Sequence, residues 1–294
     1  MQPVSVSLAT IPSPDRGVIE LGPLDLHAYG LMLAVGILVA TFVADRRFTN
    51  RGGEPRQVVD IALWVVVGGV VGARVYHLFT GYDWDSGGIA GTFAIWEGGL
   101  SIWGAVMGGA AALVIVARSR HLDSLALTDS VVVGLVLAQA IGRWGNYFNQ
   151  ELFGRPTDLP WGLEIDLPHR PPEYLQFETF HPTFLYESLY LLLMVGMLLW
   201  AERAFRFKRG QTTALYIALY TFGRFFFENM RSDPATEIGP LRVNAWVSIV
   251  LFVGAVVWFV WLGRRPDGTY PVAPWTTPVE SVTSRAVPSD DSSE

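Results

Sequence analysis

The sequence predicts an all-α integral membrane protein with seven transmembrane helices and a small outward-facing lobe between helices four and five. Of the 294 residues, 51% are hydrophobic and only 16% are charged, against roughly 25% charged in an average soluble domain. The mean hydropathy is +0.33. Apolar runs near the length that a helix needs to cross about 30 Å of hydrocarbon recur along the chain.

Seven apolar segments define the expected spans, and polar segments flank them. We expect the spans at about residues 27–44, 58–80, 98–117, 125–142, 183–201, 212–230 and 243–262. Residues 1–26 form an outward-facing N-terminal segment, 27–262 the seven-helix membrane catalytic domain, and 143–182 the lobe within it. Residues 263–294 are rich in Pro, Ser, Thr and Asp, which predicts a disordered tail.

The arginines and the lysine indicate the orientation in the membrane. Segments 45–57, 118–124, 202–211 and the start of the tail carry more of them than the opposite ends of the spans. Cytoplasmic loops are enriched in these residues, so the N-terminus faces outside and the C-terminus the cytoplasm. The first 25 residues lack a basic start followed by an apolar core, so we expect no cleavable signal peptide.

Several classes of chemistry are excluded by the residues that the chain lacks. The sequence has no cysteine, which excludes disulfides, thiolate metal sites and a cysteine nucleophile. A thiol would have to come from a substrate. No nucleotide-binding loop, metal-ligand cluster or Gly-x-Ser-x-Gly motif occurs. We therefore expect no cofactor, no metal and no nucleic-acid partner.

Several polar and charged residues lie inside the predicted spans or at their ends. The stretch GRWGNYFNQELFGRPT occupies residues 142–157, at the outer end of the fourth span. Arg74 and Arg224 fall inside predicted spans, where an unpaired cation costs a few kcal/mol or more. Glu228 follows Arg224 at i+4 and could pair with it structurally. Arg74 could likewise be snorkelling or form a structural pair.

The functional alternative is a positively charged cavity near the outer leaflet. The guanidinium group suits phosphate oxygens, and a phospholipid headgroup is the natural anion at that depth. His181 in HPTFLYE could belong to such a site or simply cap a helix at the interface. Glycines 98, 99, 104, 108 and 109 indicate close helix packing rather than a phosphate loop. The arginines at this depth are Arg74, Arg143, Arg155, Arg224 and Arg231.

Six segments together resemble the prolipoprotein diacylglyceryl transferases. In order over residues 27 to 235 they are HAYGLMLAVG, GARVYHLF, EGGLSIWGA, GRWGNYFNQELFGRPT, HPTFLYES and RFFFENMR. The resemblance implies a seven-helix enzyme of the bacterial plasma (inner) membrane with its N-terminus outside. Such an enzyme moves the diacylglyceryl group of phosphatidylglycerol to the lipobox cysteine thiol of a prolipoprotein signal peptide. It forms a thioether and releases glycerol 1-phosphate, in the first step of lipoprotein maturation.

The resemblance also implies roles for residues of this chain. Arg143 and Arg224 match essential arginines and are assigned to the lipid phosphate. Asn146 is expected to donate a hydrogen bond to the headgroup, and Glu151 to orient an arginine. Glu228 would position Arg224. Tyr29 would contact the headgroup, and Gly154 and Arg74 complete the expected substrate-binding set.

Two departures from the family pattern bear on mechanism. Trp103 stands where many members have a histidine considered as a base, and an indole cannot accept a proton. His181, Tyr29 or the lipid phosphate could serve instead. Asn244-Ala245 replaces the frequent Gly-Gln near the start of the seventh span, which puts a role for that span in doubt.

Two functions outside this family compete with the transferase. A transporter or flippase for an anionic lipid would also use intramembrane arginines, although the sequence shows no internal repeat. A non-catalytic membrane scaffold would use the polar groups only to join helices. Membrane lipids are partners in every case.

Overall fold

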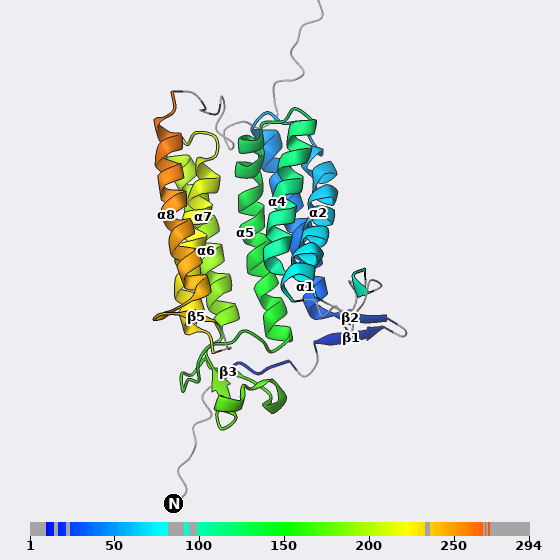
Figure 1. Ribbon diagram of the computed structural model, residues 1–294, viewed down its shortest axis with the longest axis vertical. Coiled ribbons are helices and arrows are strands. Elements are labelled where there is room, and N and C mark those ends of the chain that lie inside the picture. Colours follow the sequence, from blue (N-terminus) through cyan, green and yellow to red (C-terminus); the bar gives the residue numbers. More distant parts are fainter. Residues whose placement is uncertain are drawn as a thin grey trace, which may run out of the picture.

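A computed structural model describes residues 10–14, 17–21, 24–81, 91–93, 99–232, 236–266, 268 and 270. This part of the chain forms a bundle of seven long helices in which successive helices run in opposite directions (Figure 1). The all-helical membrane fold is confirmed. The helices are α1 (Ala28–Asn50), α2 (Gln57–Thr80), α4 (Ile102–Ser119), α5 (Ser124–Phe148), α6 (Thr183–Ala204), α7 (Gln211–Met230) and α8 (Val243–Arg264).

Six of these helices are long and apolar enough to cross a membrane, and α7 is not among them. Helix α7 contains Arg224, Glu228 and several hydroxyl and amide side chains, which lower its hydropathy. It nevertheless packs against α8 and α6 along the bundle. The predicted segment is therefore a helix of the expected length whose composition is too polar to mark it as a span.

Helix α5 is longer than the sequence predicts. Asp123 caps its N-terminus by accepting hydrogen bonds from the backbone N–H groups of Leu125 and Ala126. The helix then continues to Phe148, six residues beyond the expected end at 142. Arg143 and Asn146 consequently lie on a helix and not in the lobe. The polar side chains of this last part find partners on neighbouring elements, so their polarity does not end the helix.

The helices fall into two groups, one of α1, α2, α4 and α5 and the other of α6, α7 and α8 (Figure 1). Helices α2 and α4 approach so closely that a Cβ at Gly104 would lie 2.2 Å from the carbonyl oxygen of Gly72. Gly108 meets Gly68 in the same way. The prediction of close packing is thus confirmed at positions 104 and 108, whereas Gly98 lies outside the described residues. Helices α5 and α6 make the main contact between the groups.

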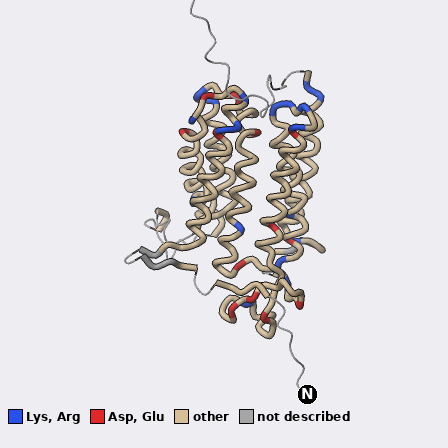
Figure 2. The backbone as a smooth tube through the Cα atoms, turned by 180° about the vertical axis from the view of Figure 1, so that it is seen from behind, with Lys and Arg blue, Asp and Glu red and all other residues tan. Residues whose placement is uncertain are grey.

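A buried ionic network ties the groups together at the end opposite the lobe. The Nη2 atom of Arg47 on α1 lies 2.7 Å from Glu202 on α6, and Arg51 donates to the same carboxylate at 2.6 Å. Asp129 on α5 accepts hydrogen bonds from the backbone N–H of Gly210 at 2.7 Å and of Thr213 at 2.8 Å. This carboxylate therefore caps the start of α7 from another helix. Figure 2 shows that Lys and Arg gather at this end.

The first residues of the predicted tail make specific contacts. Helix α8 includes Gly263 and Arg264, and the Tyr270 hydroxyl donates a hydrogen bond to Asp129 at 2.8 Å. Burial, and then the charge of Asp129, raise the pKa of Tyr270. Residues 271–294, where disorder is predicted, lie outside the described residues.

Residues 149–182, the part of the predicted lobe that follows α5, pack at one end of the bundle around a small apolar core that they share with the start of α6. The core consists of Phe153, Leu163, Ile165, Phe180 and Phe184. Strand β3 (Leu163–Glu164) pairs antiparallel with β4 (Thr179–Phe180), and Ile11 bridges to Leu163. The remaining short elements are η2 (Leu167–His169), η3 (Pro172–Tyr174), and the hairpins β1 (Val18–Leu21) with β2 (Leu24–His27) and β5 (Glu237–Ile238) with β6 (Leu241–Arg242).

Candidate functional site

An ion pair joins α5 to α6 just above the lobe. The Nη2 atom of Arg143 lies 2.6 Å from the Oε2 atom of Glu187, and the two side chains are 17% and 6% exposed. Glu187 is in HPTFLYE, one turn into α6, and the sequence reasoning assigned it no role. The sequence feature that could have identified Glu187 is a carboxylate inside a predicted span, because an ionised group in lipid requires a partner.

A second carboxylate, Glu228 on α7, contacts three basic or amide side chains. The Nη2 atom of Arg224 lies 2.6 Å from its Oε2 atom, as the i+4 spacing predicts. Asn244 on α8 donates a hydrogen bond to its Oε1 atom at 3.2 Å, and Arg242 lies 3.7 Å from the same oxygen. The start of α8 therefore contributes to this cluster, which bears on the doubt that Asn244-Ala245 raised about a role for this span.

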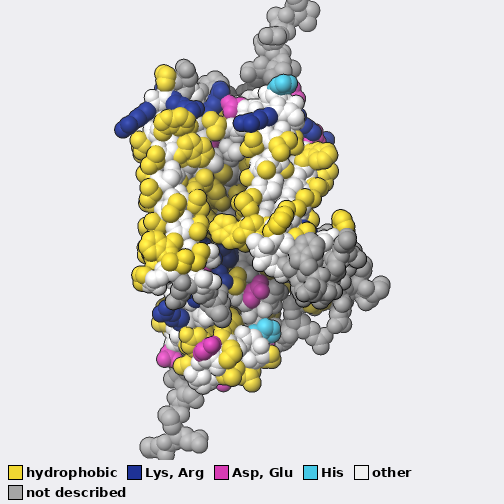
Figure 3. Space-filling model, viewed as in Figure 1, with side chains coloured by type: hydrophobic (Ala, Val, Ile, Leu, Met, Phe, Trp, Pro, Cys, Tyr) yellow, Lys and Arg dark blue, Asp and Glu magenta, His cyan; other side chains and the backbone are white. Residues whose placement is uncertain are grey.

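One residue of each ion pair lines a small pocket of about 10 Å³. Its lining includes Glu187, the partner of Arg143, and Arg224, the partner of Glu228, together with Tyr190, Leu191, Tyr220 and Phe227. Figure 3 shows Lys or Arg and Asp or Glu side chains gathered between the two groups of helices above the lobe, in a surface that is otherwise largely apolar. Arg224 lines this pocket directly, and Glu187 connects the pocket to Arg143. Two guanidinium groups held by carboxylates in a low-dielectric setting are suited to bind an anion.

The segment after α5 arranges the rest of the stretch GRWGNYFNQELFGRPT, residues 142–157, which we call the signature. Asn146 donates a hydrogen bond to Glu151 at 2.8 Å, and Asn149 donates to the same carboxylate at 3.3 Å. Gln150 and Leu152, on either side of Glu151, have φ of 51° and 57°. Backbone held in this left-handed region is characteristic of functional sites. The expectation that Glu151 orients an arginine is not what these contacts show: Glu151 holds the two asparagines, and Glu187 holds Arg143.

Two of the three signature glycines are sites of close approach. A Cβ at Gly154 would lie 2.8 Å from the Cβ of His181 and 3.3 Å from the carbonyl oxygen of Met230. A Cβ at Gly145 would lie 2.6 Å from the ring of Tyr29, which places this tyrosine of α1 beside α5. At Gly142, by contrast, no atom of the described chain lies within 4 Å of a Cβ built there.

His181 belongs to a short hydrogen-bonded chain at the start of α6. Its Nδ1 atom lies 3.3 Å from the hydroxyl of Tyr186, and Trp161 of the lobe donates to that hydroxyl at 2.7 Å. The backbone of His181 also accepts a hydrogen bond from the N–H of Gly154 at 2.9 Å. These contacts connect His181 to both the lobe and the signature. Trp103, by contrast, is 44% exposed near the start of α4.

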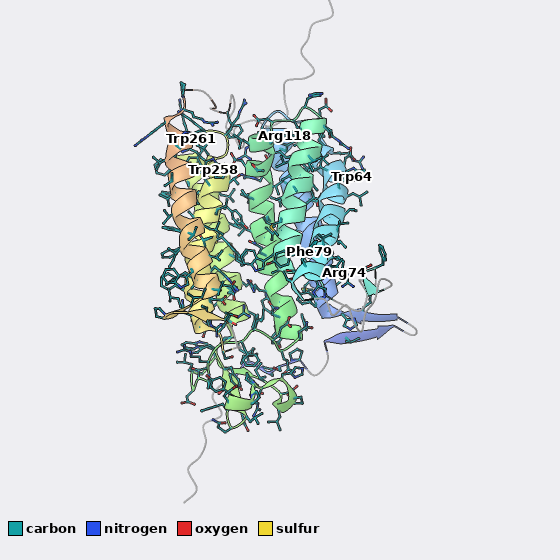
Figure 4. The ribbon with its side chains drawn as sticks, viewed as in Figure 1. Trp64, Arg74, Phe79, Arg118, Trp258 and Trp261 are labelled. Atoms are coloured by element: carbon teal, nitrogen blue, oxygen red, sulfur yellow. The ribbon has the colours of Figure 1, made fainter. Side chains whose placement is uncertain are left out.

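Arg74 occupies a different environment, near the end of α2 that faces the lobe side (Figure 4). Its guanidinium donates to the carbonyl oxygens of Thr92 at 2.9 Å, of Gly99 at 3.1 Å, and of Gly91. These bonds tie Arg74 to described residues between α2 and α4. Arg143 and Arg224 instead lie among α5, α6 and α7.

Comparison with known proteins identifies the relatives of this chain. Residues 16–261 match the family described as prolipoprotein diacylglyceryl transferase. Phosphatidylglycerol–prolipoprotein diacylglyceryl transferase 2 of Streptomyces coelicolor is 46% identical over 271 residues, which cover 91% of this chain and 86% of that protein. The Cutibacterium acnes enzyme of that name is 46% identical, with 88% and 89% covered. The Frankia alni enzyme is 48% identical, with 88% and 68% covered.

Proposed function

The chain belongs to the prolipoprotein diacylglyceryl transferase family, and we propose that the pocket lined by Glu187 and Arg224 is where it carries out its reaction. It is a transferase that moves the diacylglyceryl group of phosphatidylglycerol to a prolipoprotein, the first step of lipoprotein maturation. The observation that supports this site is that Arg224 and Glu187, the carboxylate that pairs with Arg143, line one pocket, and that each arginine lies 2.6 Å from a carboxylate.

The acceptor is the thiol of the lipobox cysteine in the signal peptide. The chain has no cysteine of its own, so the sulfur belongs to the substrate. The thiolate attacks the glycerol carbon bonded to the phosphate oxygen of phosphatidylglycerol. The carbon–sulfur bond forms as the carbon–oxygen bond breaks, and the electron pair leaves with the phosphate. The products are a thioether and glycerol 1-phosphate.

Arg143 and Arg224 stabilise the charge that develops on the departing phosphate. Each uses one terminal nitrogen for its carboxylate, and a guanidinium has five N–H donors, so donors remain for phosphate oxygens. Glu187 and Glu228 keep the two groups aligned before the substrate arrives, and such preorganised donors lower the barrier. Asn146 donates one amide hydrogen to Glu151, and its second amide hydrogen would serve the glycerol headgroup.

The proton of the thiol requires an acceptor, and His181, Tyr29 and the lipid phosphate are the candidates. The Trp161 N–H can only donate, so the Tyr186 oxygen accepts from it and has a second lone pair free. In the tautomer in which the His181 Nδ1–H donates to that lone pair, Nε2 is free to accept a proton. This arrangement supports His181 as the acceptor.

The distribution of basic residues and the family together indicate how the chain lies in the membrane. All seven helices cross the bacterial plasma (inner) membrane, with the lobe and N-terminus outside and the basic end in the cytoplasm. Helix α7 crosses with Tyr220 and Arg224 at the pocket and with Arg224 paired to Glu228, because ionisable residues in lipid face the bundle interior and pair with one another. Phosphatidylglycerol enters from the surrounding lipid, and the signal peptide approaches beside the lobe.

The direct test is product formation by the purified chain in phosphatidylglycerol vesicles with a lipobox peptide. Mass spectrometry should detect a peptide whose mass has increased by one diacylglyceryl group, and glycerol 1-phosphate should be released in equal amount. A matched peptide with serine in place of cysteine should remain unmodified. Equal modification of both peptides would refute the thiol chemistry, and modification of neither would refute the assignment of the reaction.

A further inference from the structure

A second and larger pocket lies between α6, α7 and α8, near the end opposite the lobe. Its volume is about 550 Å³, and most of its lining is apolar. Helix α6 contributes Met197 and Trp200, α7 contributes Leu215 and Leu219, and α8 contributes Phe259. We call this space the α6–α8 groove. It lies at the other end of the helices from Arg143 and is separate from the reaction pocket.

The groove is elongated along the helices. Its lining on α7 extends from Gln211 to Leu219, which corresponds to about 12 Å at the rise of an α-helix. Trp200 is 63% exposed, so the groove is open on the side of the bundle. Helices α6 and α8 are both apolar enough to span a membrane, so the medium on that side is lipid. The natural occupant of a long apolar groove facing lipid is an acyl chain.

The mouth of the groove carries positive charge. Arg206 and Lys208, in the connection between α6 and α7, both line it. The Nζ atom of Lys208 donates to the backbone of α8 at Gly263, at 2.9 Å, and Arg209 pairs with Asp123 at 2.6 Å. Arg206 is exposed and makes no hydrogen bond or ion pair within the part of the chain that the structure describes. Its guanidinium is available for an anion.

We propose that the α6–α8 groove binds an anionic phospholipid of the leaflet at the basic end, with an acyl chain along Leu215 and Leu219 and the phosphate at Arg206. Basic residues at the cytoplasmic mouth of a pocket between membrane helices are suited to such headgroups. This inference goes beyond the transfer reaction and depends only on the helices spanning the membrane. The bound lipid is a ligand and is not consumed.

Trp200 provides the measurement, because it lines the groove. The full chain is reconstituted in phosphatidylcholine vesicles with increasing fractions of phosphatidylglycerol brominated on its acyl chains, which quenches nearby tryptophans. The Trp200 signal is the difference between the wild-type protein and Trp200→Phe, since the chain has 11 tryptophans. We expect Trp200 to be quenched at a several-fold lower fraction of brominated phosphatidylglycerol than of brominated phosphatidylcholine.

The charge is tested with two matched arginine variants. Arg206→Gln should reduce the preference for phosphatidylglycerol about fivefold, as expected for one basic side chain near an anionic headgroup. Arg118→Gln removes the same charge at the same end, from α4 in the other group of helices (Figure 4), and should leave the preference unchanged.

Three results would overturn the proposal: equal quenching by the two brominated lipids, no quenching of Trp200 by either, or an equal loss in Arg118→Gln. Product formation with the lipobox peptide is measured on the same samples. Failure of the groove experiment is therefore distinguishable from failure of the proposed function.

Discussion

The guanidinium of Arg143 on α5 contacts the carboxylate of Glu187 on α6 at 2.6 Å, and this ion pair connects the two groups of helices beside the lobe. A second ion pair, between Arg47 and Glu202, connects the same two groups at the opposite end. The groups are thus tied at both ends by charges of opposite sign. Only the pair beside the lobe borders the pocket that also contains Arg224.

Arg143→Lys keeps the positive charge but replaces the planar fork with a single ammonium group. An ammonium cannot hold Glu187 and two phosphate oxygens in the same geometry. We expect kcat for the lipobox peptide to fall about 100-fold, the size of effect seen when one transition-state donor is lost. Arg118→Lys at the basic end is the matched control. Unchanged kcat in Arg143→Lys would remove this arginine from the mechanism.

Glu187→Gln keeps the shape of the side chain and removes its charge. Arg143 then loses the anion that orients it, so kcat should fall and the protein should unfold at lower temperature in detergent. The double variant with Arg143→Gln should be no less stable than either single variant, because each single variant leaves one buried charge unpaired and the double variant leaves none. Additive losses of stability in this cycle would contradict a direct pairing.

Gly154→Ala introduces a methyl group where backbone and side chains already crowd. The nearest atom, the Cβ of His181, would lie at 2.8 Å, so α6 or the signature segment must shift. We expect a loss of about 1–3 kcal/mol of stability together with lower activity. Gly142→Ala is the control from the same segment, because its Cβ meets no atom within 4 Å. Equal melting temperatures of the two variants would refute the crowding argument.

His181→Gln should impair turnover without lowering the amount of folded protein in the membrane. If His181 accepts the thiol proton, its removal changes the acidic limb of the pH profile of kcat. Tyr186→Phe deletes the hydroxyl that fixes the imidazole and should alter the same limb to a smaller extent. Tyr29→Phe tests the other protein candidate. An unaltered pH profile in His181→Gln would exclude His181 as the base.

Tyr270→Phe removes the hydroxyl that donates to Asp129 and should cost about 1–2 kcal/mol at neutral pH. Because the pKa of Tyr270 is raised in the folded protein, its contribution to stability is complete below its ordinary pKa of about 10. The contribution is lost as the pH rises above that value. The difference in melting temperature between wild type and Tyr270→Phe should therefore be constant from pH 7 to 9 and shrink above about pH 10. A difference that grows at alkaline pH would be incompatible with this sign.

The sequence alone predicts the helices and the residue types at the site. Hydrophobic run length, and the cost of a charge in lipid, are properties of short segments, so the seven helices and the anomalous Arg74 and Arg224 can be recognised locally. The i+4 pairing of Arg224 with Glu228 is local as well. Hydropathy alone does not mark α7 as a span, because Arg224, Glu228 and its hydroxyl and amide side chains make this helix polar.

Tertiary structure decided which charges are partners. The pairing of Arg143 with Glu187, and the contact of Asn244 with Glu228, connect helices that are distant in the sequence. The spacing of residues within a segment carries no information about how two helices pack. The same packing separates Arg74, bound by backbone carbonyls, from the arginines at the pocket. Sequence identified the charged groups that must be satisfied, and only the packing of α5, α6, α7 and α8 determined which partners satisfy them.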